Sequence, residues 1–186
     1  VITETEDRCV GNIRLLEGIK DRAAWAHVAA AQAAARKKDW AGVRRELSCA
    51  QDWPRDLHVL VWAAKVCEHL QDPALQQSFL ARYLELKESP SVRLLLARTL
   101  LMQKNLAAAE HHLKALLAAF PDDAEGQMLR GVLCIQREQY GEAETSFSAA
   151  LRQGAERRKC LMGMGMAAMG RAYTQGAWER FLQVLA

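Results

Sequence analysis

Apolar and small residues recur along this chain at intervals of thirty-four positions. Ala97 is followed at this interval by Gly131 and then by Gly165. The same step relates four further sets, namely Leu100, Cys134 and Ala168; Ala109, Ala143 and Ala177; Leu113, Phe147 and Phe181; and Leu116, Ala150 and Val184. At equivalent positions of successive repeats, small residues are matched by small residues and bulky apolar residues by bulky apolar residues. The pattern therefore predicts one supersecondary unit repeated in tandem.

In the clearest unit the pattern predicts two helices joined by a short turn. The first helix is expected over residues 124–137 and the second over about 141–153. Ala143, Phe147 and Ala150 follow one another at spacings of four and three, which places them on one face of the second helix. Small residues let the two helices approach closely, and Phe147 is expected to fill the space beyond them.

The same pattern extends over residues 22–186. It predicts about five helix-pair units, at residues 24–55, 56–89, 90–123, 124–157 and 158–186. Pro90 suits the first position of a helix, where its missing N–H costs nothing, and Pro121 ends a helix. Residues 1–21 are expected to form an N-terminal capping segment or helix.

This pattern resembles the tetratricopeptide repeat, a thirty-four-residue unit folded as a helix pair. The residues that carry the resemblance best are Gly131, Tyr140, Ala143, Phe147 and Ala150, together with Ala97, Ala109, Leu113 and Pro121. Two features depart from the family pattern: Arg130 stands where the family prefers Leu, and the aromatic residue of the first helix is mostly replaced. The resemblance implies an all-α, right-handed superhelical solenoid of about five antiparallel helix pairs.

The resemblance also implies a concave groove lined by one face of each first helix. The groove residues expected to contact a partner are Val28, Gln32, Leu60, Ala64, Leu94, Arg98, Leu101, Met128, Val132, Ile135, Met162, Met166 and Met169. Most of them are apolar, so we expect the groove to bind an apolar or amphipathic segment, helical or extended, of another protein. Gln32, Arg98 and Glu125 are expected to set the register of that segment.

A second interpretation of these apolar groove positions is that they pack internally. The N-terminal segment, residues beyond Ala186 or a second copy of the chain could cover it, and the apolar C-terminal end favours homo-oligomer formation there, because a terminal repeat needs a polar cap. The chain would then be a self-association module of a larger membrane or enzyme assembly.

Basic clusters raise a hypothesis from another class, an RNA- or nucleic-acid-binding helical repeat. The clusters are 36–38 with 44–45, and 157–159. Both are expected at turns or helix ends, where cations favour a helix C-terminus. The net charge of +3 and the 6% of aromatic residues make nucleic acid the weaker hypothesis.

No motif in the sequence points to catalysis. Residues 163–170 are glycine-rich, but no strand precedes them as a dinucleotide loop requires. His111 and His112 are adjacent and point about 100° apart on a helix, so they cannot share a metal. The five cysteines are widely spaced and are expected to be small buried thiols. We therefore expect a non-catalytic protein without metal, cofactor or small-molecule substrate.

The sequence contains no apolar run as long as a membrane span and no signal peptide. We expect a soluble protein with reduced cysteines, favour the cytoplasm, and expect membrane attachment only through a segment outside this chain. The first residue is Val rather than Met, as in an excised domain. The Ala- and Arg-rich composition of the chain suggests, by analogy, a scaffold for bacterial secretion, pilus or exopolysaccharide assembly.

Overall fold

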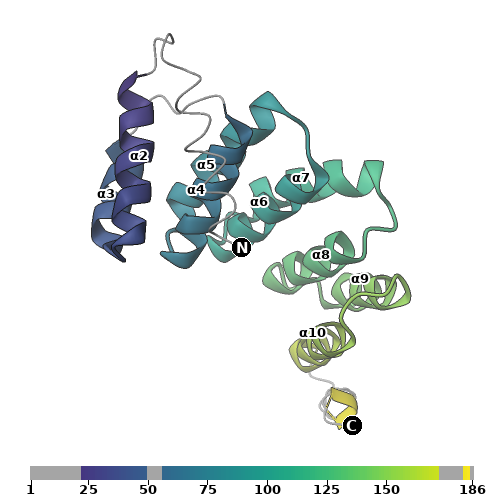
Figure 1. The fold of residues 1–186 in the computed structure, drawn as a ribbon. Coiled ribbons are helices and arrows are strands. Elements are labelled where there is room, and N and C mark those ends of the chain that lie inside the picture. Colours follow the sequence, from purple (N-terminus) through teal and green to yellow (C-terminus); the bar gives the residue numbers. More distant parts are fainter. Residues whose placement is uncertain (1–21, 50–55, 172–181, 185–186) are drawn as a thin grey trace. The chain divides into compact units, whose positions relative to one another are not determined.

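The computed structural model describes residues 22–49, 56–171 and 182–184 (Figure 1). All regular structure in these residues is helical. The helices with full bounds are α2 (Arg22–Arg36), α3 (Trp40–Cys49), α4 (Leu57–His69), α5 (Pro73–Leu86), α6 (Pro90–Met102), α7 (Leu106–Ala119), α8 (Ala124–Gln136), α9 (Tyr140–Arg152) and α10 (Arg157–Gly170). Consecutive helices pack in pairs, α2 with α3, α4 with α5, α6 with α7 and α8 with α9. The predicted all-α fold of helix pairs is confirmed.

The chain divides into two compact units, Val1–Ser89 and Pro90–Ala186. Unit 1 contains α2 to α5, and unit 2 contains α6 to α10. The capping segment predicted over residues 1–21 lies outside the described residues, as does most of the second helix predicted for the last repeat. Inside unit 2, α8 contacts α6, α7, α9 and α10 and is therefore the central helix of this unit.

The turns inside the helix pairs share one local structure. At each turn one residue has a positive φ, and the next residue donates its backbone N–H to a carbonyl five residues earlier, which closes the preceding helix. The residues with positive φ are Lys38, Gln71, Lys104 and Glu138. The hydrogen bonds run from Asp39, Asp72, Asn105 and Gln139 to Ala34, Cys67, Leu100 and Cys134, over 2.8–3.0 Å.

Side chains at the same turns begin the next helix. The carboxylates of Asp39 and Asp72 and the side-chain oxygen of Asn105 each accept a hydrogen bond from a backbone N–H in the first turn of the helix that follows. Such N-caps contribute about 1 kcal/mol each. Short polar residues after a left-handed residue therefore fix where one helix ends and the next begins.

In unit 1 the core joins the two helix pairs. Val28 of α2 and Val59 of α4 are fully buried together, with Trp25 packed against them. Phe79 of α5 is also buried. Arg82, which occupies a position where the repeat favours a small residue, is half-buried and forms an ion pair with Glu85.

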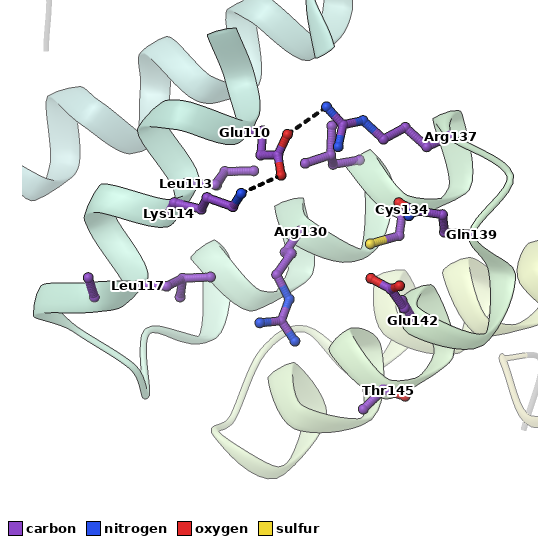
Figure 2. Close-up of a pocket in the computed structure, with 12 residues that line it drawn as sticks. Glu110, Leu113, Lys114, Leu117, Arg130, Cys134, Arg137, Gln139, Glu142 and Thr145 are labelled. Carbon is purple, nitrogen blue, oxygen red and sulfur yellow. Dashed lines mark ion pairs between the residues drawn. The ribbon is translucent and has the colours of Figure 1, made fainter. Parts of the chain in front are cut away.

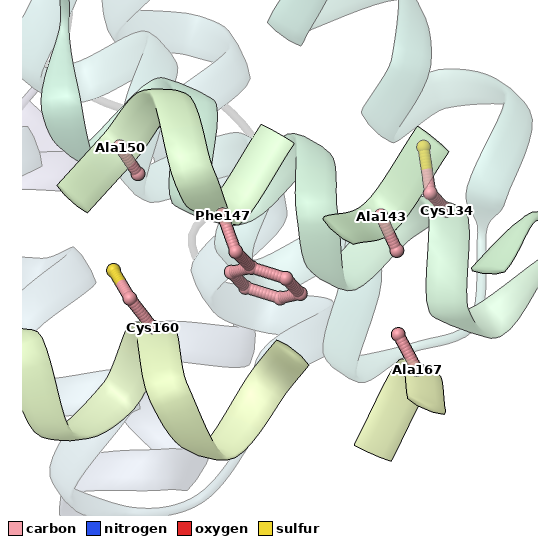
Figure 3. Packing of buried hydrophobic residues seen from close by; sticks show 6 residues of the cluster. All are labelled: Cys134, Ala143, Phe147, Ala150, Cys160 and Ala167. Atoms are coloured by element: carbon pink, nitrogen blue, oxygen red, sulfur yellow. The ribbon is translucent and has the colours of Figure 1, made fainter. Parts of the chain in front are cut away.

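In unit 2 the core centres on Phe147 of α9 (Figure 3). Its ring lies against two glycines, because a Cβ atom built on Gly131 of α8 or on Gly163 of α10 would come within 2.7 and 2.4 Å of the ring Cζ atom. The predicted role of Phe147 and Gly131 therefore agrees with the packing. Gly165, the small residue that the repeat predicts for the last unit, is buried, but Gly163 is the residue of α10 that meets the Phe147 ring.

Candidate partner-binding surfaces

Part of the predicted groove is buried and offers no surface to a partner. These residues are at most 3% exposed: Val28, Gln32, Leu60, Ala64 and Leu101. Val28 illustrates the reason, because neighbouring helix pairs pack together through this position and enclose it with Val59. Gln32 is enclosed although its amide nitrogen has no hydrogen-bond partner among the described residues. We therefore correct the predicted groove by removing these residues.

The remaining predicted groove residues all lie in unit 2, and we call them the unit 2 stripe. They are Leu94 and Arg98 on α6, Met128, Val132 and Ile135 on α8, and Met162, Met166 and Met169 on α10. The residues on α6 and α8 are half-buried, whereas the methionines on α10 are 45–50% exposed. The stripe thus becomes more exposed from α6 to α10, since α8 has a neighbour on either side.

The methionines of the stripe form one face of α10. Met162, Met166 and Met169 are separated by four and three residues, so their side chains lie above one another on the helix. The adjoining face of α8 is also apolar, with Met128 and Val132 packed against the Phe147 core cluster. Exposed large apolar side chains at helical spacing on adjacent helices are typical of protein-binding surfaces.

The charged residue of the stripe, Arg98, has an acidic partner beside the stripe. The Arg98 guanidinium on α6 forms an ion pair with the Glu125 carboxylate on α8, and both side chains are about two-fifths exposed. This pair links α6 to α8 within unit 2. The role of Arg98 and Glu125 in setting the register of a bound segment stays a prediction.

A second surface, the α7–α9 pocket, lies between α7 and α9 with α8 as its floor (Figure 2). Its volume is about 580 Å³, and its lining residues are Glu110, Leu113, Lys114, Leu117, Ala118, Arg130, Leu133, Cys134, Arg137, Gln139, Glu142 and Thr145. The deepest apolar side chains, Leu113, Leu133 and Cys134, are buried, and the charged groups surround them. The sequence does not predict this pocket, although Arg130 departs there from the repeat pattern.

Two ion pairs fix the upper edge of this pocket. Glu110 accepts from the Lys114 ammonium at 2.8 Å and from the Arg137 guanidinium at 2.7 Å. These two hydrogen bonds lower the pKa of the Glu110 carboxyl to about 2, and the bond from Lys114 has the larger effect. The carboxylate of Glu110 therefore stays ionised at neutral pH and neutralises part of the positive charge around the pocket.

Arg130 has a different environment. Its Nε–H donates to the Ser146 hydroxyl at 2.9 Å, and that hydroxyl donates to the backbone carbonyl of Glu142 at 2.8 Å. Ser146 is fully buried, so it holds the stem of Arg130 in place. Among the described residues no carboxylate forms an ion pair with Arg130, and Figure 2 shows its guanidinium extending along the pocket.

The basic clusters differ from the expectation in two ways. Arg44 forms an ion pair with Asp72 at 2.9 Å, and Arg45 approaches Glu46 at 3.4 Å, so two residues of the first basic cluster have acidic partners. Residues 157–159 form the first turn of α10, not a helix C-terminus, so the predicted favourable interaction with a C-terminal dipole is wrong for this cluster.

The cysteines agree with the expectation at three of the four described positions. Cys67, Cys134 and Cys160 are buried, whereas Cys49 is exposed at the end of α3, which corrects the prediction there. Burial raises the pKa of the Cys67 thiol to about 12 and also raises the pKa of Cys134 and Cys160. Cys9 lies outside the described residues. Among the residues with described positions, no three His, Cys, Asp or Glu side chains gather as a metal site would require.

Two further features of the described residues concern membranes and the adjacent histidines. None of the helices within the described ranges combines the length and the apolar character needed to cross a membrane. His111 and His112 lie edge to face, with ring centroids 5.4 Å apart. Neither observation adds a site to the two surfaces of unit 2.

Comparison with known proteins identifies the repeat. Residues 94–157 match the family model described as tetratricopeptide repeat. A search of curated proteins finds no match. Among solved structures, MamA from Desulfovibrio magneticus RS-1 is similar with a TM-score of 0.68 and 21% identity, over 88% of this chain and 94% of that chain.

Two further solved structures have similar folds. YrrB, described as a TPR protein with an unusual peptide-binding site, has a TM-score of 0.65 and 14% identity, over 93% of this chain and 90% of its own. PilW, described as a type IV pilus biogenesis factor, has a TM-score of 0.63 and 16% identity, over 98% of this chain and 85% of its own. Residues 94–157 therefore match the tetratricopeptide repeat family, and the described helices have the fold of these solved structures, one of which is described as a TPR protein.

Proposed function

We propose that this chain is a non-catalytic scaffold whose unit 2 stripe binds an apolar or amphipathic helical segment of a partner protein. The observation that carries the proposal is the exposed face of α10, where Met162, Met166 and Met169 follow one another at helical spacing. The half-buried residues of α8 extend this face toward α6. Adjacent helices that present apolar side chains suit a bound helix with apolar residues three and four positions apart.

Methionine suits such a surface because its side chain is flexible and polarisable and adapts to different partners. Fully burying one methionine side chain contributes roughly 1.5–3 kcal/mol. The methionines of α10 are already about half-buried, so the remaining burial contributes on the order of 1 kcal/mol for each. Together with contacts along α8, this contribution is compatible with moderate affinity and reversible assembly.

The test is a charge introduced into the stripe. We expect Met162→Glu/Met166→Glu to leave the helical content unchanged, because both positions face water, and to abolish binding of partner proteins captured from the source cells. The matched control is Met102→Glu, at a methionine of α6 that is 69% exposed and lies outside the stripe. Equal recovery of the same proteins by the stripe variant and the wild type would overturn the proposal.

The predicted alternative, self-association, is tested with the same variants. If a second copy of the chain covers the stripe, Met162→Glu/Met166→Glu lowers the mass measured by light scattering, and Met102→Glu does not. If another protein covers it, the wild type and both variants have the same mass when purified. The connection to bacterial secretion, pilus or exopolysaccharide assembly stays a prediction, and the identity of the captured proteins tests it.

A further inference from the structure

The α7–α9 pocket is separate from the unit 2 stripe and has its own chemistry. Its buried lining residues, Leu113, Leu133 and Cys134, are apolar, and its charged lining residues are three cations, Lys114, Arg130 and Arg137, and two carboxylates, Glu110 and Glu142. At neutral pH these charges leave an excess of one positive charge. The volume of about 580 Å³ lies within the range of roughly 300–1,000 Å³ found for sites that hold ligands.

Arg130 is the cation of this lining that has no ion-pair partner among the described residues. Lys114 and Arg137 both bind Glu110, at 2.8 and 2.7 Å, so both of them already have an acidic partner. Arg130 instead uses its Nε–H for the hydroxyl of Ser146. Its terminal nitrogen atoms are the part of the guanidinium that can form paired hydrogen bonds with a carboxylate.

The Arg130 guanidinium is also held in advance of any binding. Ser146 is fully buried and accepts from Arg130 while it donates to the carbonyl of Glu142. A side chain that is already oriented loses less conformational entropy when it binds a ligand. Arg130 stands where the repeat family prefers Leu, so this charge is a feature of this chain and not of the repeat scaffold.

We propose that the α7–α9 pocket binds a short segment of a partner protein that carries one carboxylate side chain beside a leucine-sized apolar side chain. The apolar side chain would contact Leu113, Leu117 and Leu133, and the carboxylate would pair with Arg130. One carboxylate matches the single excess charge of the lining. This site is distinct from the unit 2 stripe, so the chain would hold two segments, of one partner or of two.

The experiment uses the whole chain and a displayed library of random twelve-residue peptides as the probe. Selection on the wild type should enrich peptides with an acidic residue close to Leu, Ile or Met. Ala118→Trp should remove their binding, because Ala118 lines the pocket and is exposed, so that a large ring there fills the pocket without disturbing the core. Ala119→Trp is the matched control, since Ala119 is also an exposed residue of α7 but does not line the pocket.

Charge recognition is measured with a synthetic enriched peptide and its Glu→Gln or Asp→Asn analogue. The acidic peptide should bind the wild type roughly tenfold more tightly than the amide analogue, as expected for a charge-assisted pair of hydrogen bonds. In Arg130→Leu this ratio should fall to about one. In Arg152→Leu, which removes an exposed cation of α9 outside the pocket, the ratio should be unchanged.

Three results would overturn the proposal. The first is that no peptide is enriched on the wild type relative to Ala118→Trp. The second is that the affinity ratio is the same in Arg130→Leu and in the wild type. The third is that sodium acetate alone shifts the NMR signals of the pocket residues while no peptide does, which would indicate a site for small carboxylates. Met162→Glu/Met166→Glu should bind the selected peptides normally. A failure of the pocket proposal can therefore be told apart from a failure of the proposal that the stripe binds a partner helix.

Discussion

The Phe147 ring and Gly163 give a direct test of how unit 2 is packed. A Cβ atom on Gly163 would lie 2.4 Å from Cζ and 2.7 Å from both Cε atoms of the ring, closer than real carbon contacts allow. The ring cannot move freely, because Gly131 of α8 also lies against it: a Cβ atom built on Gly131 would come within 2.7 Å of Cζ. We therefore expect Gly163→Ala to be destabilising, although alanine is the better helix former.

The magnitude follows from two opposing effects. Replacing glycine by alanine inside a helix stabilises it by about 1 kcal/mol. Forcing an extra carbon into a close-packed core costs roughly 1–3 kcal/mol. The net change in the free energy of unfolding should be a loss of about 0–2 kcal/mol. For comparison, Phe147→Ala should cost roughly 3–5 kcal/mol, because Phe147 is only 1% exposed.

A double-mutant cycle isolates the contact. The ring atoms nearest to the Cβ position of Gly163 are Cζ and both Cε atoms, and a leucine at position 147 lacks all of them. In the Phe147→Leu background, Gly163→Ala should therefore become stabilising by up to about 1 kcal/mol. The coupling energy between the two positions should be on the order of 1–3 kcal/mol.

The assay is urea unfolding followed by circular dichroism, with the midpoint and slope compared across the cycle. Gly141→Ala is the matched control, because Gly141 lies in the first turn of α9 and a Cβ atom there would have nothing within 4 Å. It should be neutral or stabilising in both backgrounds. If Gly163→Ala stabilises the wild type as Gly141→Ala does, or costs the same in the Phe147→Leu background, the reasoning about the ring contact is refuted.

Two further predictions concern ionisable groups. The Cys49 thiol should react with a thiol reagent at pH 8 in the native protein, whereas Cys67, buried and with its pKa raised to about 12, should react only on unfolding; mass spectrometry of the labelled peptides checks this. Because the folded pKa of Glu110 lies below its ordinary value of 4.5, its ion pairs with Lys114 and Arg137 should stabilise unit 2 fully above about pH 4.5 and lose that effect as the pH falls through about 2. An NMR titration of the Glu110 side-chain carboxyl carbon should have its midpoint near 2, and a midpoint near 4.5 would contradict the ion-pair geometry.

Helix boundaries could be predicted closely because they depend on local signals. The helices expected over 124–137 and 141–153 are observed at Ala124–Gln136 and Tyr140–Arg152. A residue with positive φ, followed by a short polar residue, marks most of these turns, and both features are determined by neighbours in the sequence. The repeat spacing also identified Phe147 as a core residue, because bulky positions recur in register.

The surfaces could be predicted only in part, because they depend on which helices lie next to one another. Met128 and Met162 share a repeat position, yet the first is half-buried and the second is 46% exposed. Val28 has the same position in the repeat and is fully buried. Spacing along the sequence assigns a residue to a face of its helix, but coverage of that face is decided by the neighbouring helix pair.

The α7–α9 pocket could not be predicted for the same reason. It depends on the contact between Arg130 on α8 and Ser146 on α9, and on the ion pair from Arg137 to Glu110 on α7. These residues are separated by 16 and 27 positions in the sequence. Arg130 as a departure from the repeat pattern was the one signal in the sequence that pointed to this surface.

Site-specific photo-cross-linking in the source cells tests the central claim most directly. A photoreactive phenylalanine derivative is placed at position 166 in the middle of the α10 face, and at position 102 as the control, where the methionine is more exposed (69% against 45%). We predict a cross-linked adduct with a partner protein at position 166, absent at position 102 and lost when Met162→Glu is added. The account would be contradicted by the absence of an adduct at position 166, or by the same adduct in equal yield at both positions.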